Sequence, residues 1–414
     1  MANKKKAFSL ANDEQGQRLK GDLVASLLRE RKQPKTFREL GVNTLRNLPA
    51  NITMVQGLMK AVNWNMAQQE VLAGLNNTVV IVGQPNTGKS TLFNLLKGQK
   101  LSPASPQAGT TRTLVRTDFG PFTLVDTPGH LPNVMESGMD QASVIVFLID
   151  ASRGLQDSDR ELYQVIQRLG KPTIIAVNKV DDLKGGESGD QLATEIAVSL
   201  NAPGVIPISA KTGLNIAEEL IPVMIDSSPE AALAIGRELP QYRRAAAQRV
   251  IRNASLMSLA AGLEPIPFVD IPILLGTQIR LVLRLAALYG ESMDAEESRK
   301  HARELIATIA GGLGLRYLAQ QAAKVVPFGG DFVAGAIAAA ATWSIGQVAL
   351  EYYEGDKQIS PKRLQDLYKN FYRRFRREND VKTLREDAVK ELNGYQPVAL
   401  LEEPTSASLE EGQA

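Results

Sequence analysis

The sequence predicts an α/β domain with a doubly wound, mostly parallel sheet, flanked by an N-terminal helical segment and an all-α C-terminal domain. Short β-branched runs alternate with helical stretches between residues 78 and 225, a pattern typical of parallel sheets covered by helices on both faces. Such runs disappear after about residue 226, where Ala, Leu, Gly and Arg dominate. Before them, apolar residues recur at helical spacing, which predicts helices from about residue 17 to residue 77.

Length and composition exclude several classes of protein. The chain has 414 residues, 44% of them hydrophobic, which is enough for two or three domains without disulfides. It contains no cysteine, so a disulfide framework and a Cys-based metal site are excluded, and its histidines are His130 and His301. A net charge of +2 gives no global attraction for nucleic acid. The first twenty residues lack a secretory apolar stretch, which favours a cytoplasmic N-terminus.

The N-terminal segment, residues 1–77, contains one clear apolar stripe at helical spacing. We expect this face to pack on the next domain, and the alternative is a surface helix that docks on a membrane or partner. The stripe consists of Met54, Val55, Leu58, Met59 and Val62.

Five strand-like runs are expected in the α/β domain, residues 78–225. Ligands bind at the carboxyl ends of the strands in such sheets. A composition shift at residues 226–229 marks the start of the helical domain, 226–393, and residues 394–414 are expected to form a flexible acidic tail. The runs are TVVIVG, FTLVD, SVIVFLID, TIIAVN and GVIPIS.

The first of these runs leads into GQPNTGKS, a match to the GxxxxGK[ST] pattern that ends at Ser90. Its glycines let backbone N–H groups turn around phosphates, and the following helix adds its positive N-terminus. Lys89 is expected between the β- and γ-phosphates, and the Ser90 hydroxyl on Mg²⁺. The nucleotide-binding residues expected here are Gly83, Asn86, Thr87, Gly88, Lys89, Ser90 and Thr91.

Two downstream motifs follow predicted strands. Asp126 of DTPG ends FTLVD, where its carboxylate can hold a Mg²⁺-bound water, and the Gly129 amide can reach a γ-phosphate. Asn178-Lys179-Val180-Asp181 closes TIIAV. There, Asp181 can accept from the N1–H and exocyclic amine of guanine, a donor pair that adenine lacks.

The last motif, Ser209-Ala210-Lys211, ends the run GVIPI. It can supply a backbone N–H to the guanine carbonyl oxygen and a lysine stem over the base. With it, the expected base-binding residues are Asn178, Lys179, Asp181, Ser209, Ala210 and Lys211.

GQPNTGKS, GTTR, DTPG, NKVD and SAK occur in the order and approximate spacing of the five nucleotide motifs of small GTPases, and residues 78–225 resemble the Era-like branch. The resemblance implies a P-loop GTPase domain that binds GTP or GDP with Mg²⁺ and hydrolyses GTP. It makes Thr111, rather than Thr110, the switch I threonine that completes Mg²⁺ coordination. Catalysis then consists of positioning and charge neutralisation around an attacking water. The catalytic candidates are Lys89, Thr111, Gly129 and His130.

Two residues in these motifs have open interpretations. Asn86 matches the asparagine that coordinates K⁺ in potassium-activated Era-like members; the alternative is that it only suits the loop's backbone geometry. His130 departs from the Era-like pattern, which usually has an apolar residue after DTPG, and resembles the DxPGH pattern of translation-factor GTPases. It can orient the attacking water, or it is simply an exposed histidine of the switch loop.

Two segments of the helical half bear on its role. Residues 332–350 are nineteen consecutive uncharged positions with only a marginal tendency to insert into a bilayer, so a buried hairpin in a helical bundle is the favoured interpretation. Residues 368–377, YKNFYRRFRR, interleave five cations with four aromatics. This pattern suits anionic lipid headgroups, or RNA phosphates with stacked bases; the alternative is a solvated helix face.

The stretches PIPFVD and PFGGDFVAGAIAAAATWSIGQ, within residues 245–355, resemble a helical domain of unknown function found in YcjF-type inner-membrane proteins. This resemblance implies association with the cytoplasmic face of the inner membrane, peripheral or integral. The leading hypothesis is therefore a GTP-hydrolysing switch whose helical domain couples nucleotide state to an anionic membrane surface or a protein partner, with a nucleotide-dependent dimer also open. The alternatives are a GTPase of RNA or ribosome assembly, weakened because no KH-type RNA-binding loop is recognised, and a GTP-binding scaffold with negligible hydrolysis.

Overall fold

The protein, in a computed structural model, divides into two compact units. The α/β unit spans Leu72–Arg249, and the helical unit contains residues 64–71 together with the described residues from 250 onward. The boundary between them falls inside one helix, α10 (Arg243–Ala261). The structure describes residues 64–73, 79–97, 115–119, 122–126, 139, 142–183, 188–261, 270–291, 296–309, 331–355, 357–379, 383–384 and 386–387.

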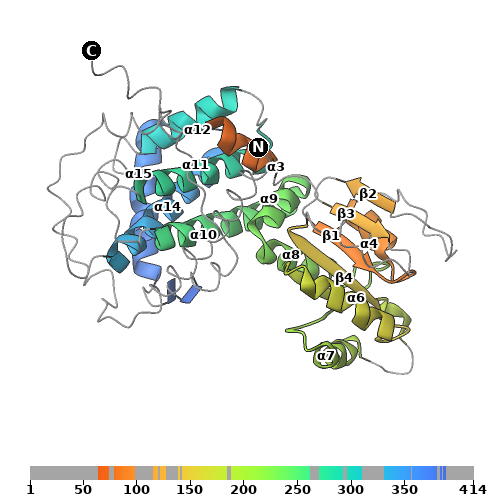
Figure 1. Ribbon diagram of the computed structural model, residues 1–414. Coiled ribbons are helices and arrows are strands. Elements are labelled where there is room, and N and C mark those ends of the chain that lie inside the picture. The colour runs from red at the N-terminus through yellow and green to blue at the C-terminus, as the bar shows by residue number, and fades with distance from the viewer. Residues whose placement is uncertain are drawn as a thin grey trace, which may run out of the picture. The chain divides into compact units, whose positions relative to one another are not determined.

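A six-stranded sheet in the order β2-β3-β1-β4-β5-β6 forms the centre of the α/β unit. Figure 1 labels β1 to β4 of this sheet. All neighbouring strands are parallel except β2, which runs antiparallel to β3 at the edge. This confirms the predicted mostly parallel sheet. The strands are β1 (Val79–Gly83), β2 (Val115–Phe119), β3 (Phe122–Asp126), β4 (Val144–Asp150), β5 (Thr173–Asn178) and β6 (Ile206–Pro207).

Burial explains which strands the sequence revealed. Every residue of β1 and β4 is buried, and apolar β-branched residues dominate both. A parallel strand covered on both faces needs such a run, so its signal is strong. Strand β2, VRTDF, lies at the edge and carries charged residues, as edge strands commonly do. It was therefore not among the predicted runs.

Helices cover the sheet and fix its carboxyl edge. Helices α4, α6 and α7 pack against the strands, and short helical elements surround the ends of β5 and β6. Because β1, β3, β4 and β5 are parallel, their carboxyl ends lie at the same edge of the sheet, and the described loops after β1, β4 and β5 start there. The helical elements are α4 (Lys89–Lys97), α6 (Asp157–Arg168), η2 (Val180–Asp182), α7 (Gly189–Leu200), η3 (Ile216–Leu220), α8 (Ile221–Ser227), α9 (Pro229–Glu238) and η4 (Pro240–Tyr242).

The helical unit joins α3, from before the sheet, to the helices that follow it. Arg280 forms an ion pair with Glu70, and the Arg303 guanidinium lies 4.8 Å from the ring centre of Trp64. The apolar stripe expected at residues 54–62 lies outside the described residues. The helices are α3 (Trp64–Ala73), the C-terminal part of α10, α11 (Asp270–Leu288), α12 (Glu296–Ile309), α14 (Asp331–Glu354) and α15 (Pro361–Glu378).

The uncharged segment 332–350 lies in α14, a single continuous helix, so the expected hairpin is wrong. Its small residues allow close packing: a Cβ added to Gly346 would lie 2.7 Å from an Ile251 side-chain atom. Its polar residues are paired, since the Thr342 hydroxyl lies 2.7 Å from that of Ser258 and accepts from the Gln278 amide at 3.2 Å. Among the residues that the structure describes, no helix is long and apolar enough to cross a membrane.

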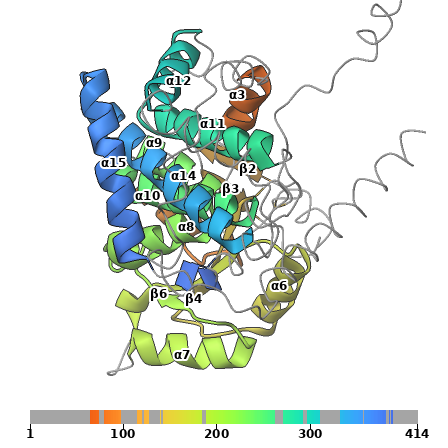
Figure 2. The same cartoon turned by 90° about the vertical axis from the view of Figure 1, so that its left-hand side faces the viewer.

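Helix α15 contains the YKNFYRRFRR segment and runs along α14 (Figures 1 and 2). Its aromatic side chains face inward: Tyr368 and Phe375 are buried, and the rings of Phe371 and Phe375 contact Trp343. Burial also raises the pKa of Tyr372 to about 12. Tyr368 and Phe375 are therefore not available to stack with bases, whereas Phe371 and Tyr372 are partly exposed, and this weakens the RNA interpretation of the segment.

Candidate nucleotide-binding site

The loop between β1 and α4 contains the GQPNTGKS motif. Two of its residues have left-handed backbone conformations, Asn86 with φ of 67° and Gly88 with φ of 91°. Asparagine tolerates this region better than most residues. The backbone geometry alone is thus sufficient to account for an asparagine at position 86.

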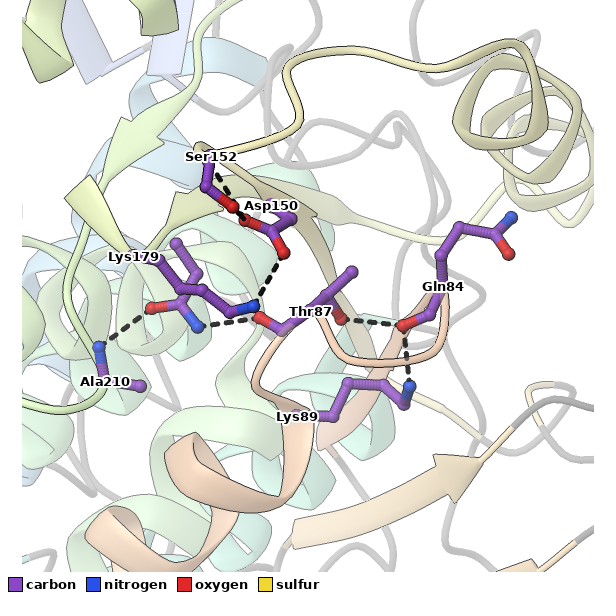
Figure 3. Close-up of polar contacts among 8 residues, drawn as sticks. Gln84, Thr87, Lys89, Asp150, Ser152, Lys179 and Ala210 are labelled. Atoms are coloured by element: carbon purple, nitrogen blue, oxygen red, sulfur yellow. Dashed lines mark hydrogen bonds and ion pairs between the residues drawn. The ribbon is translucent and has the colours of Figure 1, made fainter. Parts of the chain in front are cut away.

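The carbonyl oxygen of Gln84 accepts hydrogen bonds from two residues of this loop, Thr87 and Lys89 (Figure 3). The Lys89 ammonium donates to it at 3.0 Å, the Thr87 hydroxyl at 3.0 Å and the Thr87 amide at 3.4 Å. Lys89 and Thr87 are both buried. A buried cation is costly unless polar partners surround it. The Gln84 carbonyl thus holds the Lys89 ammonium inside the loop, in a position to contact an anionic ligand.

Asn178, the last residue of β5, connects three of the predicted motifs. Its side-chain nitrogen donates to the Thr87 carbonyl at 2.7 Å, and its side-chain oxygen accepts from the Ala210 amide at 2.8 Å. The residue is 1% exposed. One amide therefore ties the phosphate loop, the NKVD turn and the SAK loop together.

The Asp181 carboxylate is oriented by the SAK loop. The Ser209 hydroxyl donates to Asp181 Oδ1 at 2.6 Å, and the Lys211 ammonium lies 3.3 Å from Oδ2. The Thr212 amide donates to the same hydroxyl at 3.1 Å, which directs its proton toward the carboxylate. The Ser209 hydrogen bond first, and Lys211 next, outweigh burial and hold the pKa of Asp181 below its usual 3.8. Asp181 is therefore an ionised acceptor at neutral pH.

The sequence analysis missed Asp150, the last residue of β4. Its carboxylate accepts from the Lys179 ammonium at 2.6 Å and from the hydroxyl and amide of Ser152 at 2.7 and 3.0 Å (Figure 3). A signal was present, because SVIVFLID ends in a carboxylate at the edge of the sheet where ligands bind. The pairing with Lys179, however, depends on how β4 and β5 align.

The structure thus brings together the predicted phosphate-loop and base-binding residues at one edge of the sheet. Asp126 ends β3 at this same edge. The predicted residues Thr111, Gly129 and His130 lie outside the described residues. Their catalytic roles, like the roles of the other site residues, stay predictions.

The candidate metal ligands at the carboxyl ends of the strands are oxygen atoms. No group of three or more His, Asp or Glu side chains suited to a metal occurs within the described part of the chain. The Ser90 hydroxyl, in the first turn of α4, and the Asp126 carboxyl group at the end of β3 are both oxygen donors. Mg²⁺ prefers oxygen ligands and usually shares them with substrate phosphates. The donor types present therefore fit Mg²⁺.

Together, the strand order, the glycine-containing loop between β1 and α4, and the polar residues at the ends of β3 and β5 define a P-loop α/β domain of the GTPase class. Comparison with known proteins identifies two families that match this chain. Residues 78–179 match the family described as 50S ribosome-binding GTPase, and residues 227–377 match a domain of unknown function, DUF697, the YcjF-type domain. The chain thus combines a GTPase domain of the Era and Der type with a C-terminal DUF697 domain.

Two curated relatives are similar to this chain over less than half of its length. GTPase Era of Aquifex aeolicus strain VF5 is 36% identical over 171 residues, which cover 37% of this chain and 56% of Era. GTPase Der of Thermoanaerobacter pseudethanolicus strain ATCC 33223 / 39E is 35% identical over 175 residues, or 39% of each chain. The chain therefore spans about half or less of the length of these relatives.

Two solved structures of Era are also similar. One is an Aquifex aeolicus Era variant bound to GDP.AlF4-, with 31% identity, a TM-score of 0.32, and coverage of 44% of this chain and 67% of that chain. The other is Era in complex with MgGDPNP and part of 16S ribosomal RNA, with 30% identity, a TM-score of 0.32, and coverage of 44% and 68%.

Proposed function

We propose that this protein is a GTP-binding and GTP-hydrolysing molecular switch. The observation that carries the proposal is the position of Asn178, which links the phosphate loop to the SAK loop through two hydrogen bonds. The same arrangement holds Asp181 ionised beside Ser209. Phosphate donors and a base-selecting carboxylate thus share one edge of the sheet, as a nucleoside triphosphate requires.

Recognition of the base would follow from the charge of Asp181. An acceptor-only carboxylate pairs with the two donors of guanine and leaves adenine without a partner, and a site with unpaired buried polar groups rejects the wrong ligand strongly. Asp181→Asn converts one acceptor into a donor. We expect this variant to shift preference from guanine toward xanthine, measured by competition with a fluorescent GDP analogue. Retained GTP selectivity would contradict the assigned base contact.

The phosphates would be bound by Lys89 and the loop amides. The Lys89 ammonium now donates to the Gln84 carbonyl, and an approaching phosphate offers a stronger, charged acceptor close to that position. Ser90 and Thr111 hydroxyls, with Asp126 through water, would hold Mg²⁺, which supplies positive charge to the phosphate oxygens. Gly129 would donate its amide to the γ-phosphate, and His130 would orient the attacking water.

Hydrolysis is tested by phosphate release in magnesium buffer, with K⁺ compared against Na⁺. A rate that rises in K⁺ would support cation binding at Asn86, whereas equal rates would leave the left-handed backbone as the reason for that residue. His130→Ala is expected to depress kcat tenfold or more with nearly unchanged nucleotide affinity, as removal of a general acid–base group does. Negligible release under both conditions would favour the scaffold alternative.

For the helical unit, we propose contact with an anionic membrane surface through the outer face of α15. With its aromatic side chains packed inward, this face offers only charge, and each Lys or Arg near an anionic surface contributes about 1 kcal/mol. Arg374 also pairs with Glu378 at 2.9 Å, which reduces its share. The exposed cations are Lys362, Arg363, Arg373, Arg374 and Arg377.

Sedimentation with anionic liposomes, and separately with ribosomal subunits, distinguishes the membrane proposal from ribosome assembly. Each is measured with GDP and with a GTP analogue, at low and high salt. Lys362→Glu combined with Arg373→Glu should release the protein from liposomes, and Arg168→Glu combined with Arg237→Glu, exposed cations of the α/β unit, is the matched control. If the protein sediments with ribosomal subunits but not with liposomes, the membrane proposal is contradicted and the assembly role is favoured.

A further inference from the structure

The carboxylate of Asp150 is a buried charge at the edge of the sheet that carries the site. Asp150 ends β4 and stands in register with Asn178, the last residue of β5, so the next residue, Lys179, starts beside it. The Asp150 side chain is 5% exposed. A buried carboxylate is costly unless cations and hydrogen-bond donors surround it. The partners of the Asp150 carboxylate therefore indicate its role in the site.

Its two oxygens have different partners. Oδ1 accepts from the hydroxyl and the amide of Ser152, and Oδ2 accepts from the Lys179 ammonium at 2.6 Å (Figure 3). Burial raises the pKa of Asp150, but Lys179 and Ser152 together lower it further, so the group is ionised at neutral pH. Because Ser152 fixes Oδ1, Oδ2 is presented to the lysine in one direction.

Lys179 occupies a demanding position. Its backbone is left-handed, with φ of 68° and ψ of 33°, and it stands between Asn178, which joins the loops, and Asp181, which would accept from the base. Its side chain is 29% exposed. A free lysine side chain samples many rotamers, and ordering it costs conformational entropy. An anchored ammonium orders the methylene stem before any ligand arrives, so this cost does not weaken binding.

We propose that Asp150 is a positioning residue for guanine-nucleotide binding. It holds the Lys179 ammonium so that the lysine stem forms a fixed wall of the base site next to Asp181. Asp150 acts through Lys179 and does not itself touch the nucleotide. The inference rests on the proposed function, since it assumes that the ligand of this edge is a guanine nucleotide.

A double-mutant cycle tests this role, with a fluorescent GDP analogue in magnesium buffer as the probe. Asp150→Asn should weaken binding by roughly tenfold, the usual effect of losing a hydrogen bond to a charged group. Lys179→Met should weaken it at least as much, and the double variant should bind no more weakly than Lys179→Met alone. Asp157→Asn makes the same chemical change at a fully exposed carboxylate of the same unit and should bind like the wild type.

Each result of the cycle decides something. The inference is overturned if the wild type binds the GDP analogue and Asp150→Asn binds it with the same affinity. It is also overturned if the losses of the two single variants multiply in the double variant. Either result leaves the proposed function standing. A wild-type protein that binds no guanine nucleotide would overturn both. If Asp150→Asn does not fold, the double variant can still be compared with the wild type, because removing both charges leaves neither one buried alone. Wild-type affinity in the double variant would then refute the role.

Hydrolysis kinetics separate positioning from a general structural effect. Asp150→Asn should raise KM for GTP and leave kcat unchanged, because its partner contacts the base side of the site rather than the phosphates. A fall in kcat at unchanged KM would contradict a role confined to the base.

Discussion

Replacing Gly88 by alanine tests whether the phosphate loop and the base-binding loops act as one site. An added Cβ would collide with the side-chain nitrogen of Asn178, and the glycine has φ of 91°, where an alanine is strained. Asn178 cannot move away cheaply, because its amide bonds both the Thr87 carbonyl and the Ala210 amide. Relief of the clash therefore breaks the link between the loops.

The magnitude follows from these contacts. The positive φ costs an alanine about 1–2 kcal/mol. Displacing Asn178 leaves a buried carbonyl and a buried amide without this partner, at about 1–3 kcal/mol each. If the binding-competent arrangement is disfavoured by the sum of these costs, about 3–8 kcal/mol, nucleotide affinity should fall by roughly 10²-fold or more.

Isothermal titration with GDP in magnesium buffer measures this loss, and circular dichroism checks that the variant is folded. Gly290→Ala is the matched control: Gly290 has φ of 87°, but nothing lies within 4 Å of its added Cβ. The control should lose about 1 kcal/mol of stability from backbone strain and keep its GDP affinity. A folded Gly88→Ala protein that binds GDP within threefold of the wild type would refute the reasoning.

Three further predictions concern other parts of the chain. Ser209→Ala removes the 2.6 Å hydrogen bond to Asp181 and should lower GTP affinity by about 5–10-fold with little change in melting temperature; unchanged affinity in a binding titration would show that the carboxylate needs no such support. Gly346→Val forces a branched side chain against Ile251 and should destabilise the helical unit by about 1–3 kcal/mol, measured by urea unfolding; a wild-type midpoint would mean that α14 packs less closely than described. The folded-state pKa of Asp150 lies below 3.8, so its stabilising contribution is complete above pH 3.8 and is lost as pH falls through the lower, folded-state value. Asp150→Asn should lack this acid-induced loss in unfolding measurements at a series of pH values, and parallel curves for both proteins would contradict the assignment.

Local pattern was a good guide where burial is complete. The runs TVVIVG, FTLVD, SVIVFLID, TIIAVN and GVIPIS contain β1, β3, β4, β5 and β6. Strands buried on both faces must be almost continuously apolar, so their composition reveals them. Strand β2 was not predicted because an edge strand has one open side and tolerates charged residues such as Arg116 and Asp118.

Side-chain direction was where sequence reasoning failed. The cations and aromatics of α15 alternate along the chain, which suggested that both face the same ligand. On a helix they separate, because positions three and four apart share a face while adjacent positions do not. Phe371 and Phe375 pack against Trp343 of α14, whereas Arg373, Arg374 and Arg377 are exposed. The uncharged segment 332–350 was expected to form a buried hairpin, but it lies in one continuous helix, α14, whose small residues permit close helix packing.

The sequence by itself determined the order of domains, the position of the phosphate loop and the residue types that we propose select a guanine base. These properties depend on residues that are neighbours along the chain, and local geometry follows from them. Only the tertiary structure decided that Asn178 joins Thr87 to Ala210 and that Asp150 holds Lys179. Those contacts depend on the alignment of β4 with β5 and on the loops that converge at one edge of the sheet, and no local pattern specifies which side chains meet there.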